Sequence, residues 1–191
     1  MNLEDVIAPT DVRFLMTLPL ERGRFFAAVR DPRRHFVPQI CPWWSKYCDE
    51  IVAPFLALEA EATRLGCDVW RDVDLEKLAR GFNEAFKVVV VFAHWSGNRV
   101  ELAEGLVSVH DLVPCLPREF RGICDLTVCH PWALVSALKM RWPECTVKHA
   151  VGDVKSLLWW AVYQSVVRRL ASRPEPWVDA LLAVAGRFAA D

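Results

Sequence analysis

Apolar residues along this chain gather in short runs that alternate with segments of helical periodicity. The strongest run is Lys87–Ala93, in which four consecutive valines lead to His94 and to the break at Ser96-Gly97-Asn98. A run that is apolar on both faces predicts a strand buried inside a parallel sheet. A polar residue at the carboxyl end of such a strand stands where α/β sheets bind their ligands. His94 is therefore the first candidate functional residue.

The remaining apolar runs predict further strands, and the segments between them predict helices. The predicted strands are Val12–Leu18, Cys67–Val73, Ile123–Cys129 and Thr146–Val151. The predicted helices are Trp43–Leu65 with a kink or break at Pro54, a helix from an N-cap at Asp74 through Leu75, Leu78, Ala79, Phe82 and Phe86, and then Ala133–Met140, Val154–Leu170 and Trp177–Phe188. Pro19–Pro42 has no clear period and is predicted to be a loop or irregular pieces, and Val100–Val109 a small hairpin. Strands alternating with helices predict a parallel sheet with right-handed crossovers.

Composition narrows the class of protein. The 191 residues are 53% hydrophobic and 25% charged with a net charge of −1, which fits one globular domain over residues 1–191 and gives no basic excess for nucleic acid or an anionic membrane. Met1–Asp5 lacks the features of a signal peptide, and Val151–Val167 is interrupted by polar residues. The seven cysteines show no C-x-x-C spacing, and an odd number in a chain without a secretory signal favours reduced thiols. We therefore expect a cytoplasmic protein.

A thiol and an imidazole are predicted at the carboxyl ends of two strands. Cys129 ends the run 123–129, and His94 follows the run 87–93. If these strands are neighbours in a parallel sheet, their ends lie roughly 5 Å apart in the pairing direction. An imidazole there can take the thiol proton, and the thiolate can then attack an acyl carbon. The backbone N–H groups of Trp95 and Cys129 are the candidate donors to the resulting oxyanion.

The order of these elements resembles a known family. Cys67–Trp95 looks like the second strand, the helix and the histidine-bearing third strand of caspase-like cysteine peptidases of clan CD. Val100–Cys129, with Leu102-Ala103-Glu104-Gly105 and Cys124-Asp125-Leu126-Thr127-Val128-Cys129, is similar to the bacterial CHAT-domain branch, and the resemblance extends over roughly residues 12–188. It implies an α/β fold: a caspase-like three-layer sandwich, with a mostly parallel central sheet and helices on both faces. It also implies that His94 is the general base and Cys129 the nucleophile.

The resemblance further implies a function. It indicates an endopeptidase that cleaves a protein partner in a bacterial defence or regulated-death system, with a second protein as activator. The sequence departs from the family at Trp95, where the family has glycine, and at His130-Pro131-Trp132, where the family favours small residues. Thr127 stands where relatives specific for arginine or lysine often carry an acid. Thr127 and Asp125 are therefore the candidate substrate-binding residues.

Other functions stay open at this point. A caspase-like fold with an impaired site would serve as a binding or scaffold module through tryptophans such as Trp43-Trp44 and Trp159-Trp160. A flavodoxin-like binder of small molecules would need a glycine-rich phosphate loop after the first strand, which the sequence lacks. A metal site made of Cys124, Cys129 and His130 lacks the paired spacing of zinc sites. We therefore expect no metal and no cofactor.

Overall fold

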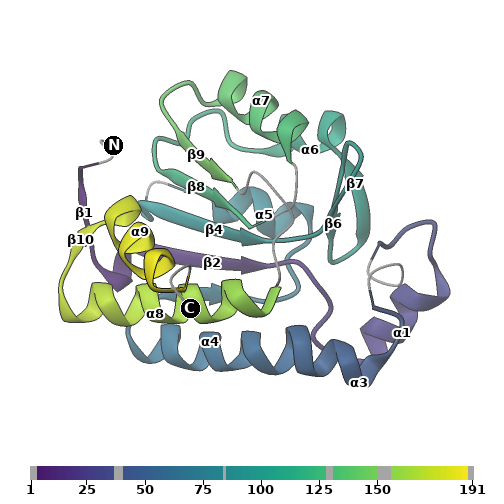
Figure 1. The fold of residues 1–191 in the computed structure, drawn as a ribbon. Coiled ribbons are helices and arrows are strands. Elements are labelled where there is room, and N and C mark those ends of the chain that lie inside the picture. The colour runs from purple at the N-terminus through teal and green to yellow at the C-terminus, as the bar shows by residue number, and fades with distance from the viewer. Residues whose placement is uncertain (1–3, 37–40, 84, 128–130, 150–155, 189–191) are drawn as a thin grey trace.

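A five-stranded parallel sheet forms the centre of the molecule (Figure 1). The computed structural model describes residues 4–36, 41–83, 85–127, 131–149 and 156–188. The strands follow the order β3-β2-β4-β8-β9, and every pairing between them is parallel. Their bounds are β2 Val12–Met16, β3 Asp68–Trp70, β4 Val88–Phe92, β8 Ile123–Leu126 and β9 Thr146–His149. With helices on both faces, this sheet confirms the predicted α/β three-layer sandwich.

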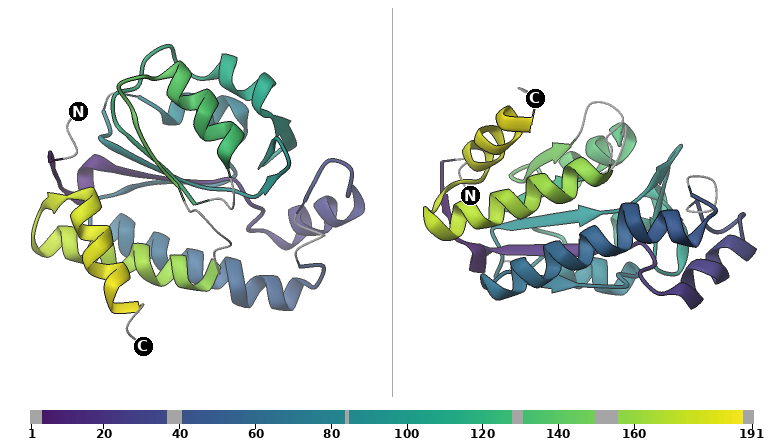
Figure 2. Two further views of the ribbon diagram at one scale, coloured as in Figure 1. Left: turned by 45° about the horizontal axis from the view of Figure 1, so that its top comes forward. Right: turned by 60° about the horizontal axis from the view of Figure 1, so that its bottom comes forward.

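Two hydrophobic cores lie on the two faces of the sheet. One core holds Phe14 and Phe92, and the helices over it are α4 Ala53–Arg64, α8 Ser156–Ser172 and α9 Trp177–Phe188. The other core holds Val89 and Val91, and the helices over it are α5 Leu75–Gly81, α6 Val109–Cys115 and α7 Trp132–Arg141. Figure 2 shows α4 and α8 running side by side. Successive valines of β4 point to opposite cores, so a central strand needs an unbroken apolar run.

Two small antiparallel sheets complete the fold. β5 Trp95–Ser96, β6 Arg99–Leu102 and β7 Gly105–Ser108 form a three-stranded meander directly after β4, which confirms the predicted hairpin. β1 Val6–Ile7 pairs with β10 Glu175–Pro176, next to the short helix η1 Pro9–Asp11. No helix in the described ranges is long and apolar enough to cross a bilayer.

The break expected at Pro54 is present as a change of helix type. α3 Trp44–Tyr47 passes into a π-helical turn, η2 Cys48–Val52, and α4 begins with Pro54 in its first turn. The helical path is continuous here, with Ala53 N donating to Cys48 O, and the π turn is the local change that accommodates the missing N–H of Pro54. Gly66 ends the region with a φ of 97°, as the sequence predicted.

The helix after Asp74 begins as predicted and ends early. The Asp74 side chain accepts a hydrogen bond from Lys77 N at 2.7 Å, so it caps α5. The helix stops at Gly81 rather than continuing to Phe86, because side chains bond its last carbonyls: Arg13 Nη1 donates to Gly81 O at 3.0 Å and Asn83 Nδ2 to Arg80 O at 3.0 Å. Tertiary packing therefore overrides the apolar period beyond Gly81.

One predicted loop contains a helix. α1 spans Arg22–Arg30, inside the segment Pro19–Pro42 that was expected to be irregular. Its buried side chains are Phe25 and Ala28. Phe25 packs against Tyr47 with 4.7 Å between ring centroids, which anchors the helix. The prediction of a loop is wrong here. The apolar residues of α1 form a single turn between arginines, which is too short to show a helical period in the sequence.

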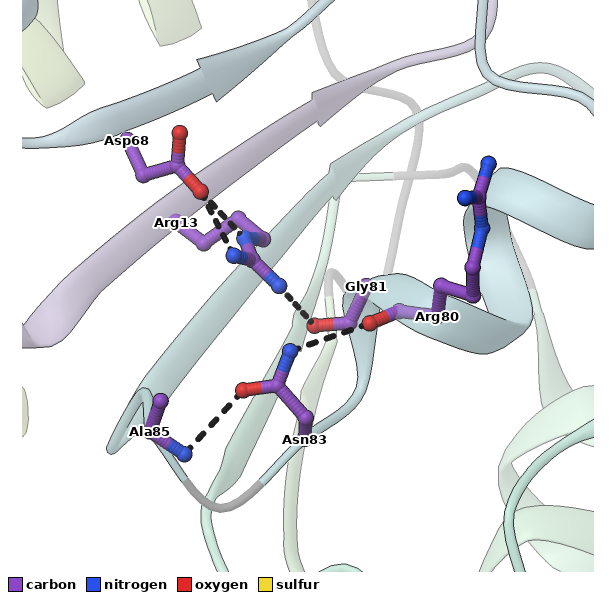
Figure 3. A network of polar contacts seen from close by, with 6 residues as sticks. All are labelled: Arg13, Asp68, Arg80, Gly81, Asn83 and Ala85. Carbon is purple, nitrogen blue, oxygen red and sulfur yellow. Dashed lines mark hydrogen bonds and ion pairs between the residues drawn. The ribbon is translucent and has the colours of Figure 1, made fainter.

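A buried arginine joins β2, β3 and α5 at the amino-terminal end of the sheet (Figure 3). Arg13, 5% exposed, reaches Asp68 Oδ2 through Nε at 2.7 Å and Nη2 at 2.6 Å. Its Nη1 donates to the Gly81 carbonyl at 3.0 Å. The guanidinium also stacks over the rings of Trp70 and Phe86, 4.2 and 3.8 Å from their centroids. The Asp68 carboxylate balances the charge of Arg13, and each of the three guanidinium nitrogens has an acceptor. These contacts hold β2, β3 and α5 together at that end of the sheet.

Candidate functional site

His94 lies at the carboxyl end of the sheet, directly after the central strand β4. Its backbone oxygen accepts a hydrogen bond from Glu101 N at 2.9 Å, which ties it to β6. The imidazole meets the ring of Phe36 edge to face, with 6.3 Å between centroids and 71° between planes. His94 therefore stands at the edge where parallel α/β sheets carry their chemistry.

Burial lowers the pKa of His94 to about 4 from the ordinary value of 6.5. The imidazole is neutral at pH 7, which is the form that accepts a proton. An imidazole with so low a pKa takes a proton from an ordinary thiol, with a pKa of about 8.5, only at a large energetic cost. The imidazole of His94 is thus shielded from water and weakly basic.

This shielding predicts a stability that depends on pH. The pKa of His94 is lower in the folded chain than in the unfolded chain, so the unfolded chain binds more protons between pH 6.5 and about 4. We expect the contribution of neutral, buried His94 to the free energy of unfolding to be fully present above pH 6.5. This contribution is lost as the pH falls towards 4. The expected loss is roughly 2–3 kcal/mol, since one pKa unit is about 1.4 kcal/mol and part of the ring stays accessible.

Urea unfolding at several pH values measures this loss. A His94→Gln chain should lose less stability than the wild type between pH 7 and pH 4.5, because glutamine does not titrate. His35 has its pKa lowered as well, chiefly by burial, so the difference between the two chains isolates the share of His94. Equal losses in both chains would contradict the burial of the imidazole.

The strand that precedes the predicted thiol in the sequence is the neighbour of β4, as expected, and β8 ends at Leu126 rather than at Cys129. β4 and β8 pair in parallel, with Val91 opposite Leu126. Beyond β8, Thr127 donates to Val91 O from its N at 3.0 Å and from its Oγ1 at 2.7 Å. Cys129 lies outside the described residues, so its roles as nucleophile and as oxyanion donor stay predictions.

Trp95 presents its amide at the outer edge of the meander. It lies in β5 opposite Val100, while the adjacent pair, His94 and Glu101, is joined by a backbone hydrogen bond. Hydrogen-bonded and non-bonded pairs alternate in antiparallel sheets, so the Trp95 N–H points away from β6. The Trp95 side chain packs against the core that contains Val91. An outward N–H next to His94 is suited to the predicted oxyanion role.

The two predicted substrate-binding residues have different environments. Asp125 is fully buried, with Lys148 Nζ 2.7 Å from Oδ1 and Trp177 Nε1 donating to Oδ2 at 2.9 Å. This enclosure contradicts the substrate-binding role predicted for Asp125, because its carboxylate is directed at the helical layer and not at the sheet edge. Thr127 is half-buried and uses its hydroxyl as a donor to β4. A contact between Thr127 and a substrate stays a prediction.

A buried pair beside His94 has no counterpart in the sequence prediction. Glu101 is fully buried on β6, and its Oε1 lies 3.2 Å from His35 Nδ1. Val100 and Leu102 on either side of Glu101 face the second core, so strand alternation predicts that Glu101 faces solvent. Residues after α1 cover that face instead. Glu101 alternates with Val100 and Leu102 as a solvent-facing residue would, so no local signal in the sequence marks it as buried.

Comparison with known proteins leaves the family open. The sequence matches no protein-family model, and no curated protein matches it. Within the described ranges, no three His, Cys, Asp or Glu side chains gather as a metal ion would require. Function is therefore inferred from the fold and from the residues at the carboxyl edge of the sheet.

Proposed function

We propose that this chain is a caspase-like cysteine endopeptidase that cleaves a protein partner through Cys129 and His94. The position of His94 carries the proposal. It follows the central strand β4, whose neighbour β8 ends three residues before Cys129 in the sequence. The meander after His94 and the parallel order of β2, β3, β4 and β8 agree with the caspase-like order of elements expected from the sequence.

The proposed chemistry assigns one task to each group. Neutral His94 takes the proton of the Cys129 thiol, and the sulfur forms a bond to the scissile carbonyl carbon. The N–H groups of Trp95 and Cys129 stabilise the oxyanion of the tetrahedral intermediate. The imidazolium returns its proton to the leaving amine as the C–N bond breaks, and water then hydrolyses the thioester and restores the thiol.

Activation by a second protein belongs to the same proposal. The low pKa of His94 makes the imidazole a poor acceptor for a thiol proton, which supports a resting form of the enzyme. A protein that rearranges this edge of the sheet would raise that pKa and start turnover. We place such an activated protease in a bacterial defence or regulated-death system in the cytoplasm, on the resemblance alone.

A peptide carrying a thiol-reactive electrophile tests the proposal. We expect Cys129 to be the cysteine labelled first in the wild-type chain, at the slow rate of the resting form, and to lose that preference in His94→Gln. The same reaction with Cys115→Ala serves as the control, because Cys115 is an exposed cysteine on α6. Intact mass and peptide mapping identify the labelled residue. Labelling of Cys129 that is as fast in His94→Gln as in the wild type would contradict the dyad.

A catalytically impaired binding or scaffold module is the second candidate. Two exposed tryptophans favour it, because Trp43 is 70% and Trp132 is 52% exposed, and large exposed rings are common at protein interfaces. In that case the electrophile would label several cysteines slowly and evenly, without dependence on His94. The labelling pattern therefore separates the enzyme from the module.

A further inference from the structure

Three consecutive residues, Arg34–Phe36, lie across the meander and end on the imidazole of His94; we call them the strap. Leu106 N donates to Arg34 O at 2.7 Å. The Arg34 side chain donates to the backbone oxygen of Glu104 at 3.2 Å. His35 meets Glu101, and Phe36 meets His94 edge to face. Each residue of the strap thus has its own contact on the meander or on the histidine that precedes it.

Gly105 makes this close approach possible. Its φ is +126°, a conformation that residues with side chains rarely adopt. A Cβ at this position would lie 2.7 Å from Arg34 O. The same oxygen accepts the hydrogen bond from Leu106 N, so Arg34 cannot move away without losing it. The backbone at β7 is therefore shaped to receive the strap.

The middle of the strap is held by a buried polar contact. The side chains of His35 and Glu101 are 17% and 1% exposed, and a buried carboxylate is costly unless other groups compensate it. Thr17 Oγ1 donates to Glu101 O at 2.7 Å, which fixes β6 to the end of β2. On its open side His35 lines a cavity of about 100 Å³ together with Thr17 and Asp72. The middle of the strap is therefore anchored on the buried Glu101, while Arg34 is exposed and His35 and Phe36 are half-buried.

We propose that the strap is a positioning device for the base, in which Phe36 shields the His94 imidazole from water and the contacts of Arg34 and His35 hold Phe36 in place. This inference rests on the proposed role of His94 in proteolysis. Phe36 is a positioning residue and takes no part in bond making. Release of the strap would expose the imidazole and make it a stronger base, which gives the proposed activating protein a defined point of action.

The shielding has a measurable consequence at His94. Burial is the cause of the lowered pKa of this imidazole, and the Phe36 ring is the aromatic ring in contact with it among the described residues. Removal of that ring should admit water and stabilise the imidazolium. The pKa of His94 should then move from about 4 towards the ordinary 6.5.

Histidine titration by NMR tests the strap without any need for activity. The full-length chain carries Cys129→Ala and ¹³C-labelled histidine, and the His94 signal is assigned by its loss in His94→Gln. Adding Phe36→Ala should raise the His94 midpoint by about one pH unit or more, whereas Phe36→Leu should raise it less because leucine still covers the ring. An unchanged midpoint in a folded Phe36→Ala chain would overturn the proposal.

A remote substitution separates the strap from local damage at Phe36. Gly105→Ala forces Arg34 away from the meander and should raise the His94 midpoint in the same direction. Gly97→Ala is the matched control, because Gly97 also has a positive φ of 64° in the meander but has no neighbouring atom within 4 Å of an added Cβ. Equal shifts in the two glycine variants, or none in Gly105→Ala, would overturn the proposal.

These titrations and the proposed function can fail independently. If the strap variants move the His94 midpoint while the peptide electrophile ignores Cys129, the strap stands as a shield of a buried histidine and the proteolytic role fails. If the electrophile labels Cys129 in a manner dependent on His94 while the midpoint stays unchanged, the peptidase stands and the strap fails.

Discussion

Replacing Cys129 by alanine is expected to abolish proteolysis by this chain. The thiolate is the nucleophile that attacks the peptide carbonyl in the proposed reaction, so its removal should lower cleavage by at least about 10³-fold, into the background. Quantitative N-terminal proteomics of cells that express the wild-type or the Cys129→Ala chain measures this loss. New protein N-termini should be present with the wild type and absent with the variant.

Two controls make that result specific. Cys115→Ala should keep the new N-termini, because this exposed thiol on α6 has no role in the proposed reaction. The thermal midpoint of Cys129→Ala should match that of the wild type, so that lost cleavage reflects lost chemistry. The same N-termini at undiminished abundance with Cys129→Ala would exclude Cys129 as the nucleophile.

The largest effect on stability is expected from Lys148→Met. Lys148 on β9 stands opposite Asp125 on β8, pairs with its carboxylate at 2.7 Å and donates to Tyr163 Oη at 2.9 Å. Methionine replaces the stem but leaves the fully buried Asp125 without its ion pair, which typically costs about 3–5 kcal/mol. Chemical denaturation should show this loss, and the thermal midpoint should fall by roughly 6–20 °C.

Lys46→Met is the matched control for Lys148→Met. Lys46 pairs with Glu50 on the surface at 3.7 Å, with 59% and 38% of the two side chains exposed, and such pairs contribute about 0–1 kcal/mol. A double variant, Asp125→Leu with Lys148→Met, should recover part of the stability because it removes both charges. Equal and small losses for Lys148→Met and Lys46→Met would show that the Asp125 carboxylate has no need of its partner.

Asp125 shows what a sequence cannot reveal about a central strand. Its neighbours Cys124 and Leu126 mark β8 correctly as a buried strand. Its partners come from β9 and from Trp177 at the start of α9, 52 residues along the chain. The sequence predicts a specificity residue at Asp125 because it lies near the predicted nucleophile, whereas Asp125 joins β8 to β9 and to the start of α9. The role of Asp125 can be predicted only once β8 is known to pair with β9, which places Lys148 opposite Asp125.

The central strands were predictable because their signal is local. The valines of β4 point alternately into the two cores, so a continuous apolar run marks this strand as buried on both faces. The position of His94 after the strand follows from the same run. The sequence also predicts the hairpin of β6 and β7, but not β5. α1 and the strap were missed because their stability comes from distant contacts, such as Phe25 against Tyr47 and His35 against Glu101. Contacts between residues far apart in the sequence cannot be predicted from the local pattern of apolar and polar residues.

The distance between the His94 ring and the Cys129 sulfur, measured in an experimental structure, tests the central claim most directly. A catalytic dyad requires the two groups to reach hydrogen-bonding range, so we predict a separation of about 3–4 Å between sulfur and the nearer ring nitrogen. A chain with a peptide electrophile bound at the site should show the same approach. A separation of more than about 7 Å in both forms would contradict a peptidase that works through Cys129 and His94.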